Sequence, residues 1–535
     1  MRFVPLISLG GALISLGNHA LPVPRPAPAP PACTRASGLV LPEGFCAVVV
    51  AERLGRVRQI TVLPNGDVAA ALGGGGPGVV LLRDSNGDGV ADSRRAFGEE
   101  GGTGIAFRDG YLWLAAPSRL VRWRLTPGED QPRGAPETMV DRLPTGGHGA
   151  KTLAFLGGDT LIVNIGSESN SCQHADRSAR SPGHDPCTEL EERAGLWRFS
   201  ATRPGQRYQD GTRYATGLRN AMALAVQPGT GRLFAAPHGR DQLGANWGFT
   251  DEQNAELPAE EFLQVDQGDD FGWPYCYFDQ RQGKRVLAPE YGGDGRRTTR
   301  CESKKAPLIG FPGHWAPMAI AFYAGTQFPE RYRGGAFIAF HGSWNRAPLP
   351  QQGYRVTFVP FDASGRPTGQ YETFATGGRG PTSLRPAGVA AGPDGSLFIA
   401  DEGSGTIWKV MVGRSGGDRA PFRSRGAATR ARGSGGKGGK GGKGGKGGKG
   451  GKGGRLGNPP SGDGMSRMLT AAGLLLAATA LTAQAPAPLK PGDQIPDLAL
   501  TGATRGGVLQ RPVRLSELRD HTLVIAFFYK ARTSG

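Results

Sequence analysis

Residues that can carry out acid–base and anion-binding chemistry stand at turns in the middle of the chain, outside the apolar runs. His148 lies between two glycines, in Gly147-His148-Gly149, which leaves its imidazole unshielded and suited to act as a general base. Other turns carry the further candidates Arg219, Asn220, Trp315, Asn345, Arg346 and Arg385. Arginine binds carboxylates bidentately and tryptophan stacks on rings, so the set suits a planar ligand with several negative charges.

The elements that must position these side chains are short strands that recur along the chain. Each copy is a hairpin turn signal followed by an aliphatic or aromatic run of strand length. About six copies are present, which indicates an internal repeat: they are residues 65–71, 109–115, 158–163, 231–236, 335–339 and 394–400. Several are followed by a second short strand, at 78–83, 119–124, 195–198 and 405–410.

Small antiparallel sheets repeated in one chain favour an all-β fold, a six-bladed β-propeller with sheets packed radially around a channel. Helical periodicity is nearly absent between residues 40 and 410, which agrees with an all-β domain. A β-sandwich and two unrelated β domains are the alternatives. In a propeller the blade ends converge on one face around the axis, so we expect the candidate residues to lie there together.

The formal net charge of +17 does not indicate a nucleic-acid partner. Residues 411–460 contain thirteen Lys or Arg and one Asp, so most of the excess charge belongs to a tail. The remainder is close to balanced and has no basic patch with interleaved aromatic residues.

The N-terminus has the form of a secretory signal peptide over residues 1–20, with one positive charge and a short apolar core. This segment is too short to span a membrane stably. Residues 21–37 are rich in Pro and Ala, and we expect them to be disordered. The protein is therefore expected to be exported, to the periplasm or the extracellular space.

Six cysteines fall into three local pairs, which are Cys33 with Cys46, Cys172 with Cys187, and Cys276 with Cys301. In an exported protein this spacing indicates three loop-closing disulfides, although six cysteines allow fifteen pairings. No Cys-x-x-Cys-His motif for covalent haem occurs, and no Cys/His cluster has zinc spacing.

An acidic loop suggests a structural calcium ion. The loop places oxygen ligands at alternate positions, and its candidate ligands are Asp84, Asn86, Asp88 and Asp92. The pattern matches the start of an EF-hand loop but lacks the closing Glu. The alternative is an ordinary Asp/Asn/Gly turn between two blades.

Five motifs in order resemble the glucose/sorbosone dehydrogenase family, soluble quinoproteins that carry pyrroloquinoline quinone (PQQ) on a six-bladed propeller. The motifs are Gly147-His148-Gly-x-Lys151, Gly217-x-Arg219-Asn220, Phe271-Gly-Trp-Pro274, His314-x-Ala316-Pro317 and His341-Gly-Ser-Trp-Asn-Arg346. They cover about residues 38–411, and the last motif is most similar to the sorbosone and pyranose dehydrogenase branch.

The resemblance implies a role for each matching residue. It makes His148 the base that takes the substrate hydroxyl proton, and Arg219 the group that polarises the quinone carbonyl. It assigns cofactor binding to Asn220, Trp315, Asn345, Arg346, Arg385 and Lys151. It also implies a calcium ion held by the backbone carbonyls of Gly239 and Arg240. Two departures stand out, because Gly147 replaces an acid of the glucose dehydrogenases and Arg346 stands near the place of a lysine.

The tail differs from the propeller in composition. Residues 412–464 form a basic Gly/Lys-rich run that we expect to be a flexible linker. Residues 465–485 are a second signal-like segment, and residues 486–535 resemble the start of a peroxiredoxin or thioredoxin-like domain. Such a short fragment has too little core to be stable alone. We interpret the tail as read-through of an adjacent reading frame; a membrane anchor is the alternative.

Three functions compete at this point. The first is a PQQ-dependent sugar or aldehyde dehydrogenase acting on sorbosone, an aldose or a pyranose. The others are a propeller that binds a ligand without PQQ, and a calcium-dependent sugar lactonase, which needs carboxylates along the axis. The cationic set favours a carboxylated cofactor. Without a haem motif, electrons must pass to an external acceptor, a cytochrome or a quinone.

Overall fold

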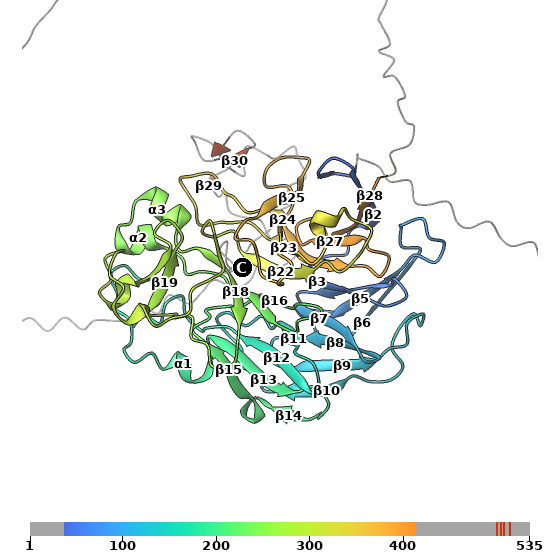
Figure 1. Ribbon diagram of the computed structural model, residues 1–535, viewed down its shortest axis with the longest axis horizontal. Helices are drawn as coiled ribbons and strands as arrows, with labels where there is room; N and C mark the ends of the chain where they lie inside the picture. The colour runs from blue at the N-terminus through green and yellow to red at the C-terminus, as the bar shows by residue number, and fades with distance from the viewer. Residues whose placement is uncertain (1–36, 414–498, 501–502, 505–506, 509–512, 515–535) are drawn as a thin grey trace, which may run out of the picture. The chain divides into compact units, whose positions relative to one another are not determined.

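The structure, a computed structural model, describes residues 37–413, together with 499–500, 503–504, 507–508 and 513–514 (Figure 1). The predicted signal peptide, nearly all of segment 21–37, the linker and the second signal-like segment lie outside the described residues, as does Cys33. The chain divides into two compact units, Met1–Asp418 and Arg419–Gly535. In the second unit β29 (Ala499–Leu500) pairs with β32 (Val513–Arg514), and β30 (Ala503–Thr504) pairs with β31 (Gly507–Val508).

In the first unit six sheets of four or five strands stand around a common axis as the blades of a propeller (Figure 1). The innermost strands are β3 (Val57–Val62), β7 (Gly104–Arg108), β11 (Leu153–Phe155), β16 (Ala223–Val226), β22 (Pro317–Phe322) and β26 (Pro386–Ala391). Each contacts the next, and β26 contacts β3, so the ring is closed. The predicted six-bladed β-propeller is confirmed, and the β-sandwich alternative is wrong.

The first three blades follow one another along the chain. Blade one adds β4 (Val68–Leu72), β5 (Val79–Arg83) and β6 (Ser93–Phe97) to β3. Blade two adds β8 (Tyr111–Ala115), β9 (Leu120–Arg124), β10 (Glu137–Asp141) and the edge strand β14 (Gln206–Arg207) to β7. Blade three adds β12 (Thr160–Ile165), β13 (Gly195–Ser200) and β15 (Thr212–Thr216) to β11.

The remaining blades complete the ring. Blade four adds β17 (Leu233–Ala236), β18 (Glu260–Val265) and β21 (Ile309–Phe311) to β16. Blade five adds β23 (Ala336–Phe340), β24 (Arg355–Val359), β25 (Glu372–Gly377) and β1 (Leu39–Val40) to β22. Blade six adds β27 (Leu397–Asp401), β28 (Thr406–Val412) and the N-terminal strand β2 (Phe45–Ala51) to β26. Each predicted repeat strand is the second strand of a blade.

Two long insertions carry the α-helices of the propeller unit and two disulfides. The connection between β12 and β13 contains α1 (Glu189–Glu192) and the Cys172–Cys187 disulfide, as predicted. The stretch from β17 to β21 contains α2 (Leu243–Trp247), α3 (Asp251–Glu256) and the hairpin of β19 (Cys276–Asp279) with β20 (Lys284–Leu287). The predicted Cys276–Cys301 disulfide closes this hairpin. Short 3-10 helices are η1 (Tyr208–Asp210), η2 (Pro289–Tyr291), η3 (Thr299–Cys301) and η4 (Glu330–Tyr332).

The axis is filled rather than open at the depth of the first strand residues. Gln59 of β3 donates from Nε2 to the carbonyls of Met222 (3.0 Å) and Met318 (2.7 Å), which belong to blades four and five. Met222 and Met318 pack with the buried Ala387 of blade six. The side chains of Met222, Met318 and Ala387 thus form an apolar cluster near the axis. Among the described residues no helix is both long and apolar enough to cross a membrane.

The pairing of β2 with β28 closes the ring and is anchored by Phe45. The ring of Phe45 is 5% exposed, and its centroid lies 4.8 Å from that of Phe328 and 5.2 Å from that of Phe374. Replacing a buried Phe with Ala removes its transfer energy and leaves a cavity.

We therefore predict that Phe45→Ala lowers the free energy of unfolding by about 3–5 kcal/mol. Denaturant titration of the full chain, followed by near-ultraviolet circular dichroism, measures this loss. Val40→Ala is the matched control, because Val40 is 55% exposed on β1 and should cost little. Equal losses in the two variants would contradict the role of Phe45 in closing the ring.

Candidate active site

The predicted residues gather at one end of the propeller, because successive strands of a blade run antiparallel. The connections that enter the innermost strands and those that join the second strand to the third lie at the same end. His148 precedes β11, Arg219 and Asn220 precede β16, and Arg385 directly precedes β26. The expectation that blade ends bring these residues to one face is met.

His148 is held by Ser167, from the connection between β12 and β13. Its Nδ1 lies 2.9 Å from the carbonyl oxygen and 3.0 Å from the hydroxyl oxygen of Ser167. The Ser167 hydroxyl donates its hydrogen to the carbonyl of Ser169 at 2.7 Å, so it can only accept from His148. The proton therefore sits on Nδ1, and Nε2 carries the lone pair that a general base needs.

Burial also keeps His148 neutral. The residue is only 7% exposed, so the expectation that flanking glycines leave it unshielded is wrong. Burial, and then the charge of Arg219, lower the pKa of His148 well below its usual value of 6.5. The imidazole is therefore unprotonated at neutral pH.

Two glycines allow the close approach of backbone around His148. A Cβ on Gly166 would meet the His148 carbonyl oxygen at 2.5 Å. Gly147 has φ +46°, and a Cβ there would lie 2.2 Å from the backbone oxygen of Glu168. No side chain fits at position 147, so the acid found there in the glucose dehydrogenases has no room in this chain; Ser167 orients the imidazole.

Arg219 lies next to this histidine and is buried, with its backbone carbonyl accepting from the Ser167 N–H at 2.8 Å. Its guanidinium donates to the carbonyl of Asn170, the carbonyl of Gly239 and the Asp241 carboxylate. With a further bond to Asn170 Oδ1, four of its five N–H groups have acceptors among the described residues. Burial lowers the pKa of Arg219 to about 10, so the group stays charged.

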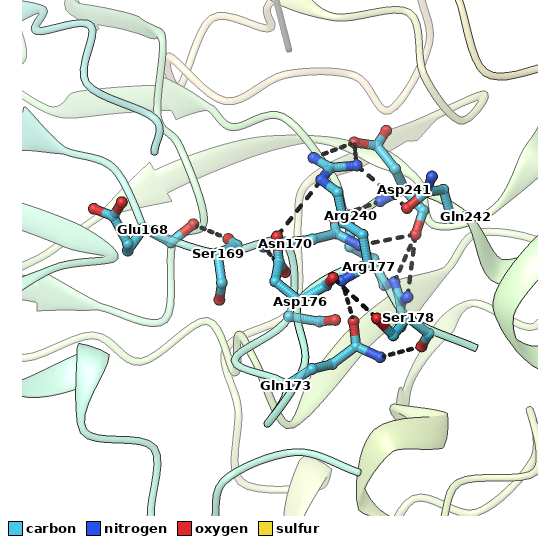
Figure 2. A network of polar contacts seen from close by, with 12 residues as sticks. Glu168, Ser169, Asn170, Gln173, Asp176, Arg177, Ser178, Arg240, Asp241 and Gln242 are labelled. Atoms are coloured by element: carbon cyan, nitrogen blue, oxygen red, sulfur yellow. Dashed lines mark hydrogen bonds and ion pairs between the residues drawn. The ribbon is translucent and has the colours of Figure 1, made fainter. Parts of the chain in front are cut away.

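Asp241 is the counter-ion of this half of the site. Figure 2 shows it beside Asn170 and Arg177, with Arg177 reaching it at 3.2 Å from the disulfide-pinned loop. Asn170 Oδ1 accepts from the Asp241 backbone N–H at 2.9 Å. Burial alone would raise the pKa of Asp241, but contact with His314 and the charges of the two arginines hold it well below its usual range.

Three further buried titratable groups, Glu260, His238 and His314, lie around Arg219 and Asp241. Glu260 accepts from the backbone N–H groups of Gly239 (3.1 Å) and Ala316 (3.3 Å), and burial raises its pKa to about 7. His238 Nε2 lies 2.9 Å from the carbonyl of Pro317, and burial lowers its pKa to about 3. His314 lies 3.6 Å from Asp241.

A second charge cluster forms where blades one, five and six meet. Glu402 accepts from Arg56 and from Arg58 at 2.6 Å, and its carboxylate lies 2.8 Å from His341 Nε2. Arg385 lies 3.1 Å from the other nitrogen of His341. Two guanidinium groups contact the Glu402 carboxylate and a third, that of Arg385, contacts only His341, while the buried Asp401 carboxylate accepts from the Arg385 backbone N–H. Three guanidinium groups against two carboxylates leave an excess of positive charge, which suits an anionic ligand.

Asn220 and Lys151 have structural partners. Asn220 Oδ1 accepts from Asn164 at 3.0 Å, and Asn164 Oδ1 accepts from the Ala221 N–H at 2.9 Å, which joins blades three and four. Lys151 is 1% exposed and donates to the Gly149 carbonyl at 2.7 Å, which braces the His148 loop. Burial lowers the pKa of Lys151 to about 7. Neither contact supports the predicted cofactor-binding role.

Arg346 and Trp315 are turned into the protein. Arg346 is 1% exposed and donates to the carbonyls of Ala255 and Gly313 and to the Glu256 carboxylate, so it caps the C-terminus of α3. The ring of Trp315 is 4% exposed among Phe311, Phe340 and Tyr371, with the Arg355 guanidinium 4.5 Å from its centre. These contacts argue against the expected cofactor contacts, because the donors of Arg346 are occupied and the Trp315 ring is covered.

The predicted metal ligands are engaged by the protein. Asp84 accepts from the N–H groups of Gly87 and Gly89, and Asp92 accepts from Ser85. Asn86 and Asp88 bond to each other. In the part of the chain that the structure describes, no three His, Cys, Asp or Glu side chains are grouped to hold a metal ion. The structural calcium at this loop stays a prediction.

The predicted calcium ligands Gly239 and Arg240 lie in the connection between β17 and β18. The Gly239 carbonyl accepts from Arg219 at 2.8 Å and keeps a second lone pair. The Arg240 side chain forms a buried ion pair with Glu290, at 2.5 Å, which fixes this connection against η2 (Figure 2 shows the Arg240 side).

A family model described as TrAA12-like matches residues 39–413, the whole propeller. The chain belongs to the TrAA12-like family.

Similar proteins agree with this assignment. The TrAA12-like chain is 30% identical over 202 residues to an uncharacterised protein of Borreliella burgdorferi, a match that covers 37% of this chain and 48% of that protein. It is 23% identical over 313 residues to a pyrroloquinoline quinone-dependent sugar dehydrogenase of Hypocrea jecorina, covering 52% and 66% respectively. The matched segments thus span about half to two thirds of these relatives.

A solved structure supports the fold of the TrAA12-like chain. The holo form of the pyranose dehydrogenase PQQ domain from Coprinopsis cinerea superposes with a TM-score of 0.58 at 19% identity. The match covers 72% of this chain and 99% of that domain. At this identity the likeness is evidence for the propeller alone.

Sequence reasoning missed several charged residues of the TrAA12-like site. Asp241 and Glu402 were not singled out, although Glu402 follows a repeat strand as directly as His341 does and Asp241 lies in the loop after another repeat strand. The position after a repeat strand was therefore the signal that could have found them. Arg56 and Arg58 carry no such signal, because they stand at the start of β3 without a flanking turn motif.

We predict that Glu402→Gln lowers the free energy of unfolding at pH 7 by about 3–5 kcal/mol, because it leaves the buried Arg58 without a counter-ion. Burial alone would raise the pKa of Glu402, but His341 and Arg58 hold it far below 4.5. This carboxylate thus stabilises the fold above pH 4.5, and the stabilisation is lost as the pH falls below that value.

Denaturant titration at pH 7 and pH 3.5 tests this dependence. The difference between wild type and Glu402→Gln should shrink at the lower pH. Glu372→Gln is the matched control, because Glu372 is 41% exposed in its ion pair with Arg331 and should cost no more than about 1 kcal/mol. A difference between wild type and Glu402→Gln that is the same at both pH values would contradict the prediction.

Proposed function

We propose that this chain is an exported quinoprotein that oxidises a sugar or sugar aldehyde with PQQ and passes the electrons to an external acceptor. The observation that carries the proposal is the pairing of a neutral base, His148, with an excess of guanidinium groups at the same end of the propeller. The Hypocrea jecorina relative, a pyrroloquinoline quinone-dependent sugar dehydrogenase, supports the same assignment.

The residues present fit a carboxylated cofactor. Arg56 and Arg58 contact the Glu402 carboxylate, and Arg385 lies between His341 and the backbone contact to Asp401, so the positive charge of the three arginines is only partly balanced. Guanidinium groups bind carboxylates through two parallel hydrogen bonds. These arginines would hold the cofactor's carboxylates, and the Gly239 and Arg240 carbonyls would hold its calcium ion.

The chain's own residues supply binding, proton transfer and charge stabilisation. When bound, PQQ would supply the quinone that accepts hydride from the substrate carbon. His148 takes the substrate hydroxyl proton at Nε2, since Ser167 keeps Nδ1 protonated. Arg219 stays charged and has one N–H group left, which suits it to stabilise negative charge beside His148.

The lactonase alternative has less support. A metal-dependent hydrolytic site needs free carboxylates along the axis, whereas Asp241 and Glu402 are each taken by two arginines. The signal-like form of residues 1–20 supports export. A cytochrome or a quinone is the proposed electron acceptor.

We predict that the full chain, purified and supplied with PQQ and calcium chloride, reduces an electron-accepting dye in the presence of aldoses, sorbosone or glucosone. His148→Ala should bind PQQ with unchanged affinity but lose about 10²–10⁴-fold in kcat, as expected for loss of a general base. Spectrophotometric PQQ titration and dye reduction measure the two effects separately.

His174→Ala is the matched control, because His174 is exposed on the loop closed by Cys172 and Cys187 and should leave both quantities unchanged. If the wild-type chain neither changes the PQQ spectrum nor reduces dye, the proposed function is wrong.

The pH dependence should follow His148. Because burial and Arg219 lower its pKa, the imidazole stays unprotonated as the pH falls through 6.5. We predict that kcat/KM is constant from pH 8 to pH 6.5 and declines only at more acidic values. Dye-reduction rates at low sugar concentration measure this profile; a half-maximal point at or above pH 6.5 would contradict it.

A further inference from the structure

One large aromatic side chain is exposed on the connection between β23 and β24, which lies at the end of the propeller that carries the site. Trp344 is 44% exposed, whereas Ser343 and Arg346 beside it are 3% and 1% exposed. The connection starts at His341, which contacts Glu402 and Arg385 of the cationic cluster. The indole is therefore held at the edge of the site.

The backbone around Trp344 is fixed on both sides. The carbonyl of Ser343 accepts from the Tyr354 hydroxyl at 2.6 Å, and the Ser343 hydroxyl bonds to Gln351 and Gln352. Arg346 fastens the other side to α3 and to the carbonyl of Gly313. Because the backbone on both sides is fixed, the Trp344 indole stays exposed to water and the free energy of burying it is not gained on folding. A ligand that covers the indole would gain that free energy on binding.

Asn345 adds a hydrogen-bond donor next to this ring. Its Nδ2 is buried and has no acceptor among the described residues, while its backbone carbonyl accepts from Asn254 at 3.1 Å. A buried donor without an acceptor is unfavourable, so turning the partly exposed Asn345 amide outward to a ligand oxygen would stabilise it.

We propose that Trp344 and Asn345 form the subsite that selects the sugar, an inference that rests on the proposed function. The apolar C–H face of a cyclic sugar packs on the indole, and a ring hydroxyl or ring oxygen accepts from Asn345 Nδ2. The subsite favours cyclic sugars over short open-chain aldehydes, which lack an extended face. Trp344 is a specificity-determining residue, and Asn345 contacts substrate rather than the cofactor.

Kinetics of Trp344→Ala in the full chain with PQQ and calcium test the subsite. We expect the KM for a cyclic aldose to rise on the order of tenfold, with kcat within about threefold, because stacking contributes binding and not chemistry. KM for glyceraldehyde, KM for the dye and the affinity for PQQ should stay unchanged. Trp344→Phe should restore most of the lost affinity, and Val90→Ala, 46% exposed between β5 and β6 at the other end of the propeller, should behave as wild type.

The possible outcomes distinguish a failure of the proposed subsite from a failure of the proposed function. An unchanged sugar KM, or a rise in the dye KM alone, overturns the subsite; the latter result would make Trp344 a contact for the electron acceptor. If the wild type shows no turnover, the proposed function fails, and saturation-transfer NMR with glucose on the full chain still decides the subsite. Transfer to glucose that Trp344→Ala abolishes supports it, and transfer that is absent or unchanged overturns it.

Discussion

The pairing of the N-terminal strand β2 with the C-terminal strand β28 is the constraint on which the site depends. It places blade six against blade one and so closes the ring of innermost strands. Arg56 and Arg58 come from blade one, and Glu402 comes from blade six, more than three hundred residues later in the chain. Their ion pairs exist only when the ring is closed, so the cationic cluster is a product of the closure rather than of any local sequence.

The half of the site that holds His148 sets the protonation state of this base through charge. Blades three and four supply His148 and Arg219, and blades one, five and six supply the cluster around Glu402. Positive charge near an imidazole disfavours its protonated form, so Arg219 helps to keep His148 ready to accept a proton. Arg219 therefore helps to maintain the base, and Asp241 limits the positive charge beside it by pairing with Arg219 and Arg177.

Local signals were enough to predict the propeller and to single out His148 and Arg219, although not Asp241. The repeat strands stand out because a hairpin turn precedes each apolar run, and His148 and Arg219 stand out because they enter the next strand from a glycine-rich turn. The cluster around Glu402 was only partly predictable in this way: Arg385 enters its strand from a turn and Glu402 directly follows a repeat strand, whereas Arg58 lies inside β3 without such a signal. Arg58 and Glu402 are 344 residues apart in the sequence, so no local pattern can show that they are in contact.

The prediction for Arg346 failed because of the insertion in blade four. Arg346 has the composition of a ligand-binding residue, but its carboxylate and carbonyl partners belong to α3, a short helix that periodicity did not reveal. Because Arg346 is hydrogen-bonded to α3 of blade four, these contacts fix the backbone two residues after the exposed Trp344. The length and capping of the blade-four insertion therefore set where the indole stands. A change in that insertion would shift the Trp344 indole without changing any residue of the β23–β24 connection itself.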